Sequence, residues 1–321
     1  MLSSRRGRTG LDAGASRLFL LSLTIAAAAL AAVAVALVDG TSSIRVGPHE
    51  PVGRFSVLHE SFTYPRANAA AVVVLVLAAL GLFVVLQLIW AAAAEVRAQR
   101  RFSRAIATRH PRSHGGVMLV DEAQPQAFCA GLLRPRIYLS TGALRHLGQD
   151  ELEAVLAHEE HHRARRDPLR IAVARVFSHA LFFLPVMRRL SDRYCAMAEL
   201  AADDAAVRMS RGGRATLASA LLSFSASAHP RGAVGIAPER VDHLLGRTPS
   251  WRLPGALLVA GVATVVLLTV LAFEAGRMAV VQATFSLPVF SSRPCVIALA
   301  LVPGIVAAVA VTYLRRPGGA H

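Results

Sequence analysis

The chain has 321 residues, of which 54% are hydrophobic and only 17% are charged. A soluble globular domain has about 25% charged residues, and the mean hydropathy of this chain is +0.48, so a disordered, collagen-like or wholly aqueous protein is excluded. Its 35 basic residues, all arginine, exceed its 20 acidic residues and give a net charge of +15. A chain that is both apolar and basic is typical of a membrane protein with basic cytoplasmic loops. The three cysteines, Cys129, Cys195 and Cys295, have no CxxC spacing, which argues against a disulfide framework or a cysteine metal site.

Four apolar stretches predict membrane-spanning helices at residues 18–38, 69–94, 255–273 and 295–314, because a helix needs about 20 such residues to cross a bilayer. Arginines precede the first stretch, as in a signal peptide, but its apolar run is longer than the roughly 7–15 residues of a signal sequence. We therefore expect a retained anchor. The sequence predicts a mainly α membrane protein with about four transmembrane helices, for which the lipid bilayer is a partner.

The distribution of arginine predicts the orientation in the membrane. Four arginines lie in the tail 1–17, and six lie at 97–112, directly after the second stretch, with no acidic residue among them. Because such segments stay in the cytoplasm, we expect the tails 1–17 and 315–321 and the segment 95–254 to be cytoplasmic, and the loops 39–68 and 274–294 to be external. This predicts a multi-pass protein of a prokaryotic plasma membrane. The arginine run lacks interleaved aromatic residues and any nucleic-acid-binding motif, so no direct binding of nucleic acid is expected.

The sequence pattern of the segment 95–254, expected to be cytoplasmic, predicts an α+β domain inserted between spans two and three. A short apolar run at 117–120 predicts one strand, and 127–140 predicts two more strands with a turn. From Asp150 the pattern becomes helical, with Asp150 and Glu153 as a possible capping box, and this helix is expected to stop at Asp167-Pro168. The apolar stretch 169–187 is interrupted by polar residues, so we expect a buried or membrane-skimming helix rather than a fifth span.

One motif in this domain carries chemistry. His158-Glu159-Glu160-His161-His162 matches HExxH, and residues four apart lie on one face of a helix, so His158 and His162 can hold one metal ion. Glu159 is then placed to take a proton from the attacking water. A site built from His158 and His161, three apart, is an alternative, but it leaves Glu159 without this role.

A catalytic zinc site needs a third protein ligand, and Glu199 in a downstream alanine-rich helical stretch is the candidate. Asp203 lies one turn later on the same face and can accept the second N–H of a ligating histidine. The sequence therefore predicts one Zn²⁺ per chain, held by His158, His162 and Glu199. Cys195 is interpreted as a small buried hydrophobic side chain rather than a ligand. His179 is interpreted as a core or interfacial histidine rather than a donor to the transition state. No residue that would stabilise the oxyanion is evident.

The spacing of His158–His162 and Glu199-Leu200-Ala201-Ala202-Asp203 resembles the gluzincin pattern of HExxH followed by ExxxD. The flanking sequence resembles that of the integral membrane metallopeptidases of the BlaR/MecR antibiotic-sensor type. The residues that carry this likeness are 130–139, 151–159 and 165–169. The resemblance covers about 117–207. It implies a zincin-like fold in which an edge strand, here within 127–139, pairs with an extended peptide substrate.

The resemblance implies a membrane-bound zinc endopeptidase that acts on the cytoplasmic face and cleaves a protein or peptide. The expected substrate of such an enzyme is a cytosolic winged-helix repressor, cleaved as a regulatory step in signal transduction. The chain is expected to lack the extracellular sensor domain of sensor members, because the predicted external loops are too short for a domain with its own core. A membrane sensor partner would then deliver the signal.

Three other functions fit the sequence less well. A quality-control protease of the heat-shock or CAAX type usually has glycine before the second histidine, where this chain has His161. A non-catalytic signalling scaffold with a structural zinc would have no use for Glu159. A transporter is disfavoured because the four stretches show no internal repeat and no intramembrane acid.

Overall fold

The computed structural model describes residues 10–43, 45–46, 53–57, 60–64, 69–227, 237–247, 255–282 and 284–285. The chain separates into two compact units, one formed by Met1–Val33 and Leu82–Leu268 and the other by Ala34–Gly81 and Thr269–His321. The predicted fourth span, 295–314, and the tail 315–321 lie outside the described residues.

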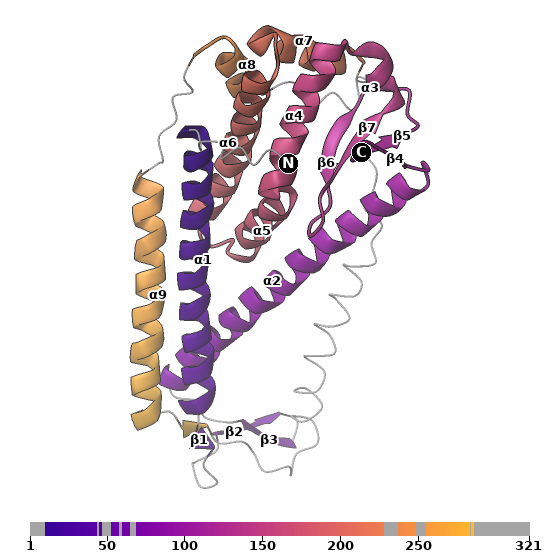
Figure 1. Ribbon diagram of the computed structural model, residues 1–321. Helices are drawn as coiled ribbons and strands as arrows, with labels where there is room; N and C mark the ends of the chain where they lie inside the picture. The colour runs from indigo at the N-terminus through magenta and orange to yellow at the C-terminus, as the bar shows by residue number, and fades with distance from the viewer. Residues whose placement is uncertain are drawn as a thin grey trace. The chain divides into compact units, whose positions relative to one another are not determined.

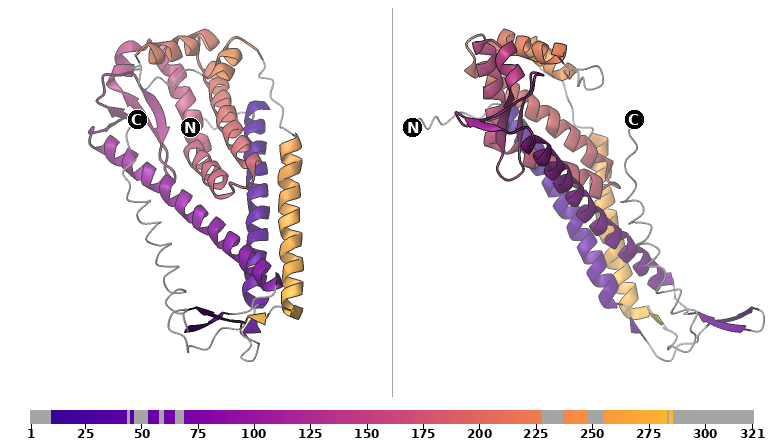
Figure 2. Two further views of the ribbon diagram at one scale, coloured as in Figure 1. Left: turned by 180° about the vertical axis from the view of Figure 1, so that it is seen from behind. Right: turned by 90° about the vertical axis from the view of Figure 1, so that its right-hand side faces the viewer.

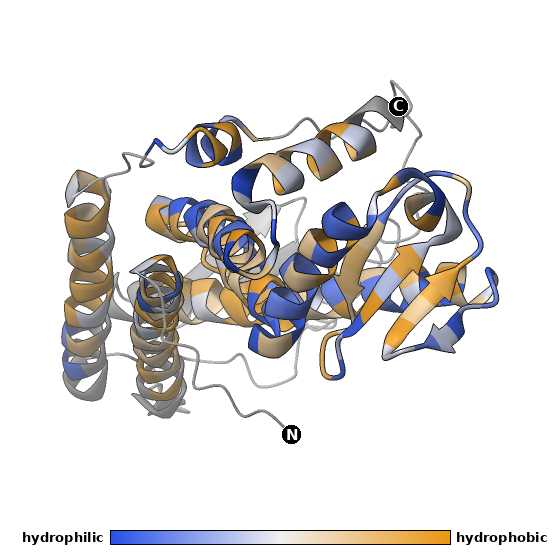
Figure 3. Ribbon diagram, turned by 45° about the horizontal axis from the view of Figure 1, so that its top comes forward, coloured by the Kyte–Doolittle hydropathy of each residue, from blue (hydrophilic) through white to orange (hydrophobic). Residues whose placement is uncertain are grey.

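Three long helices contain the first three apolar stretches: α1 (Gly10–Ser43), α2 (Ala69–Ala107) and α9 (Gly255–Gln282). By length and composition, Gly10–Val35 and Val76–Ala107 could cross a membrane, whereas Gly255–Leu271 is a shorter apolar segment. Each helix extends beyond the predicted span, because its apolar run continues into more polar helical sequence. Figure 3 shows hydrophobic residues on several sides of α1 and α9, as expected for helices in contact with lipid. The described residues thus contain two candidate spans, and four spans stay a prediction.

A four-stranded mixed sheet precedes the metal-binding motif. Its strands are β4 (Arg112–His114), β5 (Val117–Val120), β6 (Ala127–Ala130) and β7 (Arg136–Ser140), in the order β4-β5-β7-β6. The strands predicted at 117–120 and within 127–140 are confirmed. Gly131 begins the turn after β6 with φ +114°, a conformation that glycine adopts readily. Strand β7 pairs with both β5 and β6, and β6 lies at an edge of the sheet. Within the predicted edge-strand region 127–139, β6 is therefore the edge strand.

Among the described residues, six helices complete the domain that carries the motif. They are α3 (Thr141–His146), α4 (Gln149–Arg165), α5 (Asp167–Ala180), α6 (Pro185–Met209), α7 (Gly213–Ser227) and α8 (Pro238–Leu244). Helix α4 lies between α6 on one side and β6 and β7 on the other (Figure 1). The predicted cap of α4 is wrong by two residues, because the N-cap is Gly148 instead of Asp150. The backbone N–H of Gly148 donates to Glu151 Oε2 at 2.9 Å, and glycine has no side chain to complete a capping box.

The stretch 169–187 is two helices instead of one. Helix α5 ends at Ala180, α6 begins at Pro185, and the turn between them buries Leu181 and Leu184 completely. These side chains belong to an apolar cluster with residues of α1, α2 and α9, among them Ile25, Val84 and Leu257. The front and back views show this turn beside α1 (Figures 1 and 2). Proline has no backbone N–H, so a helix that ran through it would lose one backbone hydrogen bond. Pro185 therefore explains why a new helix begins there.

The other unit contains short strands that the sequence did not predict. Strands β2 (Gly53–Val57) and β3 (Glu60–Tyr64) form an antiparallel hairpin, and β1 (Arg45–Val46) pairs in parallel with β8 (Thr284–Phe285). These strands fall within the predicted external loops 39–68 and 274–294.

Candidate metal centre

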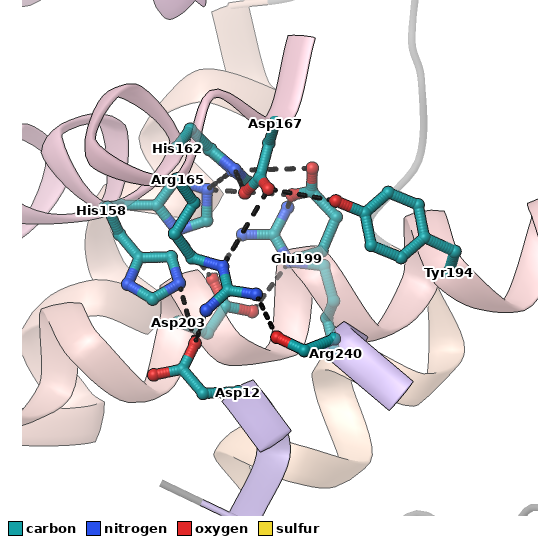
Figure 4. A network of polar contacts seen from close by, with 11 residues as sticks. Asp12, His158, His162, Arg165, Asp167, Tyr194, Glu199, Asp203 and Arg240 are labelled. Atoms are coloured by element: carbon teal, nitrogen blue, oxygen red, sulfur yellow. Dashed lines mark hydrogen bonds and ion pairs between the residues drawn. The ribbon is translucent and has the colours of Figure 1, made fainter. Parts of the chain in front are cut away.

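Helices α4 and α6 bring three potential metal ligands together. His158 and His162 lie on one face of α4, and their Nε2 atoms are 3.1 Å apart. Glu199 on α6 faces them, with Oε2 at 3.6 Å from His158 Nε2 and Oε1 at 3.6 Å from His162 Nε2. Figure 4 shows the three side chains pointing toward one another. Among the described residues, these three form the group whose ligand atoms all lie within 4.8 Å of one another.

The separations of these atoms fit a zinc ion. With Zn–N and Zn–O bonds of about 2.0–2.2 Å in tetrahedral geometry, two ligand atoms lie about 3.3–3.5 Å apart. The observed separations of 3.1 and 3.6 Å bracket this value. Two imidazoles and one carboxylate, with a fourth position left for water, are the donor set of a catalytic zinc site rather than of a structural one.

A buried carboxylate stands behind each histidine. His158 Nδ1 lies 3.0 Å from Asp203 Oδ1, and His162 Nδ1 lies 2.8 Å from Asp167 Oδ2. Asp203 and Asp167 are almost fully buried. A carboxylate in this position fixes the tautomer and orientation of the imidazole, so that Nε2 presents its lone pair to the metal. The position of Asp203 is the one expected from the sequence, whereas Asp167 was expected only to end the helix.

The backbone at Arg166 places Asp167 beside His162. Arg166 has φ +54° and ψ +41°, the left-handed conformation, which costs a residue with a side chain about 1–2 kcal/mol. This residue ends α4 and lets α5 begin immediately with Asp167. The carboxylate of Asp167 also accepts a hydrogen bond from the Tyr194 hydroxyl on α6 at 3.1 Å, so α4, α5 and α6 are joined behind the centre.

Neighbouring opposite charges shift the pKa values of the buried ionisable groups at the centre. Burial alone would lower the pKa of His158, but its contacts with Asp203 and Glu199 raise that pKa to about 10. Burial alone would raise the pKa of Glu199, but His158, His162 and Arg240 lower it to about 2. The pKa of Asp203 is likewise lowered to about 2 against the effect of burial, by His158 and Arg240. Both carboxylates are therefore ionised at neutral pH, as metal binding requires.

Glu159 lies next to the first ligand and lines a cavity of about 500 Å³ that opens onto the centre. Strand β6 forms one wall of this cavity with Ala127, Phe128 and Cys129, and α5 and α7 contribute to other walls. Burial, followed by the charge of Glu159, raises the pKa of the Cys129 thiol to about 12, so this cysteine is a neutral wall residue. The cavity thus joins the metal ligands, the candidate base and a sheet edge.

The alternative ligands considered from the sequence lie outside the three-residue group. The Nε2 atom of His161 is 3.2 Å from Asp12 Oδ1 on α1, and Arg165 donates to the same aspartate at 3.0 Å and to Ser16 at 2.9 Å. Cys195 is half-buried, whereas His179 is exposed and is therefore not a core side chain; neither is part of the group.

The structure also places residues at the centre that sequence reasoning missed. Arg240 on α8 contacts both Asp203 and Glu199, and Tyr194 reaches Asp167. Arg240 lies far from the motif in sequence, in a short helix with no recognisable spacing to it. Only Asp167 carried a usable signal, because it follows His162 at the start of the next helix.

The sequence is similar to those of known peptidases, in agreement with a metal centre of this kind. Residues 19–243 match the model of the family described as BlaR1 peptidase M56. The chain is also 36% identical over 81 residues to the protein named Protease HtpX of Hydrogenovibrio crunogenus (strain DSM 25203 / XCL-2), a stretch that covers 24% of this chain and 27% of that relative. The chain thus spans about a quarter of the curated relative it matches. Both likenesses are to peptidases and support a membrane metalloprotease. Because the family match extends over more than half of its length, the chain belongs to the BlaR1 peptidase M56 family.

Proposed function

We propose that this chain is a membrane-bound zinc endopeptidase that cleaves proteins on the cytoplasmic face of the plasma membrane. One observation carries the proposal: two imidazole nitrogens and a carboxylate converge beside Glu159 in the lining of a cavity that also includes residues of β6, an edge strand among the described strands. A structural metal site needs neither an open position nor an adjacent base, so this combination favours catalysis.

Zinc is the metal that this donor set favours. Carboxylate-oriented imidazoles suit zinc among the common metals of proteins. Zinc, when bound, polarises the scissile carbonyl and lowers the pKa of the attacking water toward about 7. We assign His158, His162 and Glu199 as its ligands, with Asp203 and Asp167 holding the two histidines.

Glu159 is assigned as the general base. It accepts a proton from the attacking water and then passes that proton to the leaving amine, so the carboxylate is regenerated at the end of each cycle. Glu159 is only 8% exposed, which limits the competition of bulk water for this proton. The cavity that Glu159 lines gives the substrate access to it.

Strand β6 is assigned as the binding site of the substrate backbone. Its outer edge is unpaired among the described strands, and its residues line the same cavity as Glu159. An extended peptide can add to such an edge through backbone hydrogen bonds. The substrate would therefore be an extended segment, drawn from a protein near the membrane because α1 and α2 tether the domain there.

We infer that the physiological substrate is a cytosolic winged-helix repressor inactivated by cleavage, as the family likeness suggests. A second candidate function is general turnover of membrane proteins, as in quality control; the likeness to Protease HtpX agrees with a protease in either case. Co-expression of a candidate repressor with wild-type enzyme and with Glu159→Gln distinguishes the two. A specific repressor fragment seen with wild type alone supports regulatory proteolysis. An intact repressor together with faster loss of misfolded membrane proteins would assign quality control instead.

A further inference from the structure

Arg240 forms the most extensive polar contact at the centre that is not made by a proposed ligand. Its Nε donates to Asp203 Oδ2 at 2.8 Å and its Nη2 to Asp203 Oδ1 at 2.6 Å, a two-pronged contact with one carboxylate. Its third nitrogen, Nη1, lies 3.3 Å from Glu199 Oε2. One guanidinium therefore contacts the proposed third ligand and the carboxylate behind the first, as Figure 4 shows.

The ligands differ in how firmly their surroundings hold them. The side chains of His158 and His162 are each 10% exposed, whereas that of Glu199 is 38% exposed. Glu199 is thus the ligand with the most freedom to turn away into the cavity. Among the described residues, Arg240 is the cation within ion-pair distance of Glu199 apart from the two histidines themselves.

Helix α8 brings Arg240 to this place through contacts on both sides of it. Glu239, the preceding residue, accepts from Arg193 on α6 at 2.8 Å, and the Arg193 side chain is only 6% exposed. Leu244, one turn later, packs against an apolar cluster that includes Ala154 on α4 and Leu217 on α7. The position of Arg240 is therefore fixed independently of its contacts with the two carboxylates.

A planar guanidinium fork suits this arrangement better than a point charge. It can meet both oxygens of Asp203 in parallel and still offer a third N–H to Glu199. Lysine has a single ammonium group on a flexible stem, so it could neutralise one carboxylate without fixing the other.

We propose that Arg240 is a positioning residue of the metal centre, which holds Asp203 against His158 and Glu199 toward the ligand position. The centre is then complete only when α8 is docked on α6. This role rests on the metal site proposed above, and it goes beyond that site by making a distant segment, α8, part of the binding geometry.

The test is a titration of the full chain in detergent with Zn²⁺, in competition with a colorimetric chelator. Arg240→Lys should fold, because it retains the charge, and should bind zinc about tenfold more weakly, while Arg240→Ala should lose about 10–100-fold, the usual scale for a partner behind a metal ligand. Millimolar methylguanidine should restore part of the zinc affinity of Arg240→Ala. Arg247→Gln is the matched control, since Arg247 is 73% exposed and pairs with Asp242 outside the centre.

Wild-type zinc affinity in Arg240→Lys, or no response of Arg240→Ala to methylguanidine, would overturn the proposed role while leaving the metal site intact. If the wild-type chain itself bound no zinc, the metal assignment would fail and this role with it. Equal weakening in Arg247→Gln would point to a general effect of removing arginine, and it would also count against the proposal.

Discussion

His162 Nδ1 on α4 lies 2.8 Å from the Asp167 carboxylate at the start of α5. Nδ1 of His158 likewise lies 3.0 Å from a carboxylate oxygen of Asp203, so a buried acid lies behind each of the two histidines proposed as ligands. The two acids come from different helices. The centre therefore depends on the packing of α4 against both α5 and α6.

We expect Asp167→Asn to weaken zinc affinity or peptide cleavage about 10–100-fold, because an amide holds the imidazole less firmly in its ligating tautomer. Tyr194→Phe is the matched control, since it removes only the second hydrogen bond to Asp167 and should have a smaller effect. Zinc titration and turnover measure both variants. Equal activity of Asp167→Asn and wild type would show that this carboxylate does not act through His162.

The contact between α1 and α4 predicts a stability effect separate from catalysis. Arg165 is 15% exposed and donates to Asp12 and Ser16, so Asp12→Ala should cost about 1–3 kcal/mol by removing the charged partner of a largely buried guanidinium. Thermal unfolding in detergent measures this loss. The exposed pair Arg163–Glu160 is the control, because Glu160→Gln should cost only about 0–1 kcal/mol. A similar loss in both variants would contradict the importance of burial.

The stabilisation that zinc gives should grow with pH. The pKa of His158 is raised from 6.5 to about 10 in the folded, metal-free protein, so its contribution to stability is complete below about pH 6.5 and is lost as the pH rises through about 10. Zinc binds the neutral imidazole and must displace this proton. The pKa values of Glu199 and Asp203 are lowered to about 2, so their contributions stay constant above about pH 5.

The increase in melting temperature on adding zinc should therefore be larger at about pH 9 than at about pH 6. Chelator-treated protein titrated with Zn²⁺ at the two pH values gives the comparison. His158→Ala should bind zinc weakly and show little of this pH dependence. A zinc effect that declines from pH 6 to pH 9 in the wild type would contradict the assignment of His158 as a ligand.

The orientation predicted from arginine placement can be tested with reporter fusions. A fusion after Arg112 should report a cytoplasmic location, and a fusion at Gly53 should report an external one, because arginine-rich segments resist translocation. Replacing several of the arginines at 97–112 by glutamine should weaken this bias. An external report from the fusion after Arg112 would place the metal centre on the other side of the membrane and exclude a cytosolic repressor as substrate.

Local patterns were enough to predict which three side chains converge at the candidate centre, and several elements of the fold. The HExxH spacing depends only on helix geometry, and the strands near it follow short apolar runs between turn residues. The cap of α4 was misplaced because Asp150 and Glu153 fit the capping-box pattern, whereas Gly148 has no capping side chain and gives no such signal in the sequence. The break at Pro185 was missed because the apolar stretch around it is continuous in composition.

The contacts that complete the site were beyond such patterns. Arg240 reaches Asp203 through the packing of α8 on α6, and Asp12 reaches Arg165 across 153 positions of sequence. No periodicity or spacing specifies which of 35 basic residues will meet a given carboxylate. The two α1–α4 and α6–α8 contacts are tertiary, so the structure was needed to find them.

The most direct test of the account compares new protein N-termini in membranes that contain wild-type enzyme or Glu159→Gln at equal abundance and equal zinc content. Because Glu159 is assigned as the general base and not as a ligand, the variant should keep its zinc and lose cleavage by at least about a hundredfold. A set of N-termini present with wild type and absent with Glu159→Gln is the predicted result. The same N-termini at the same yield in both membranes would contradict the assignment of this centre as a protease active site.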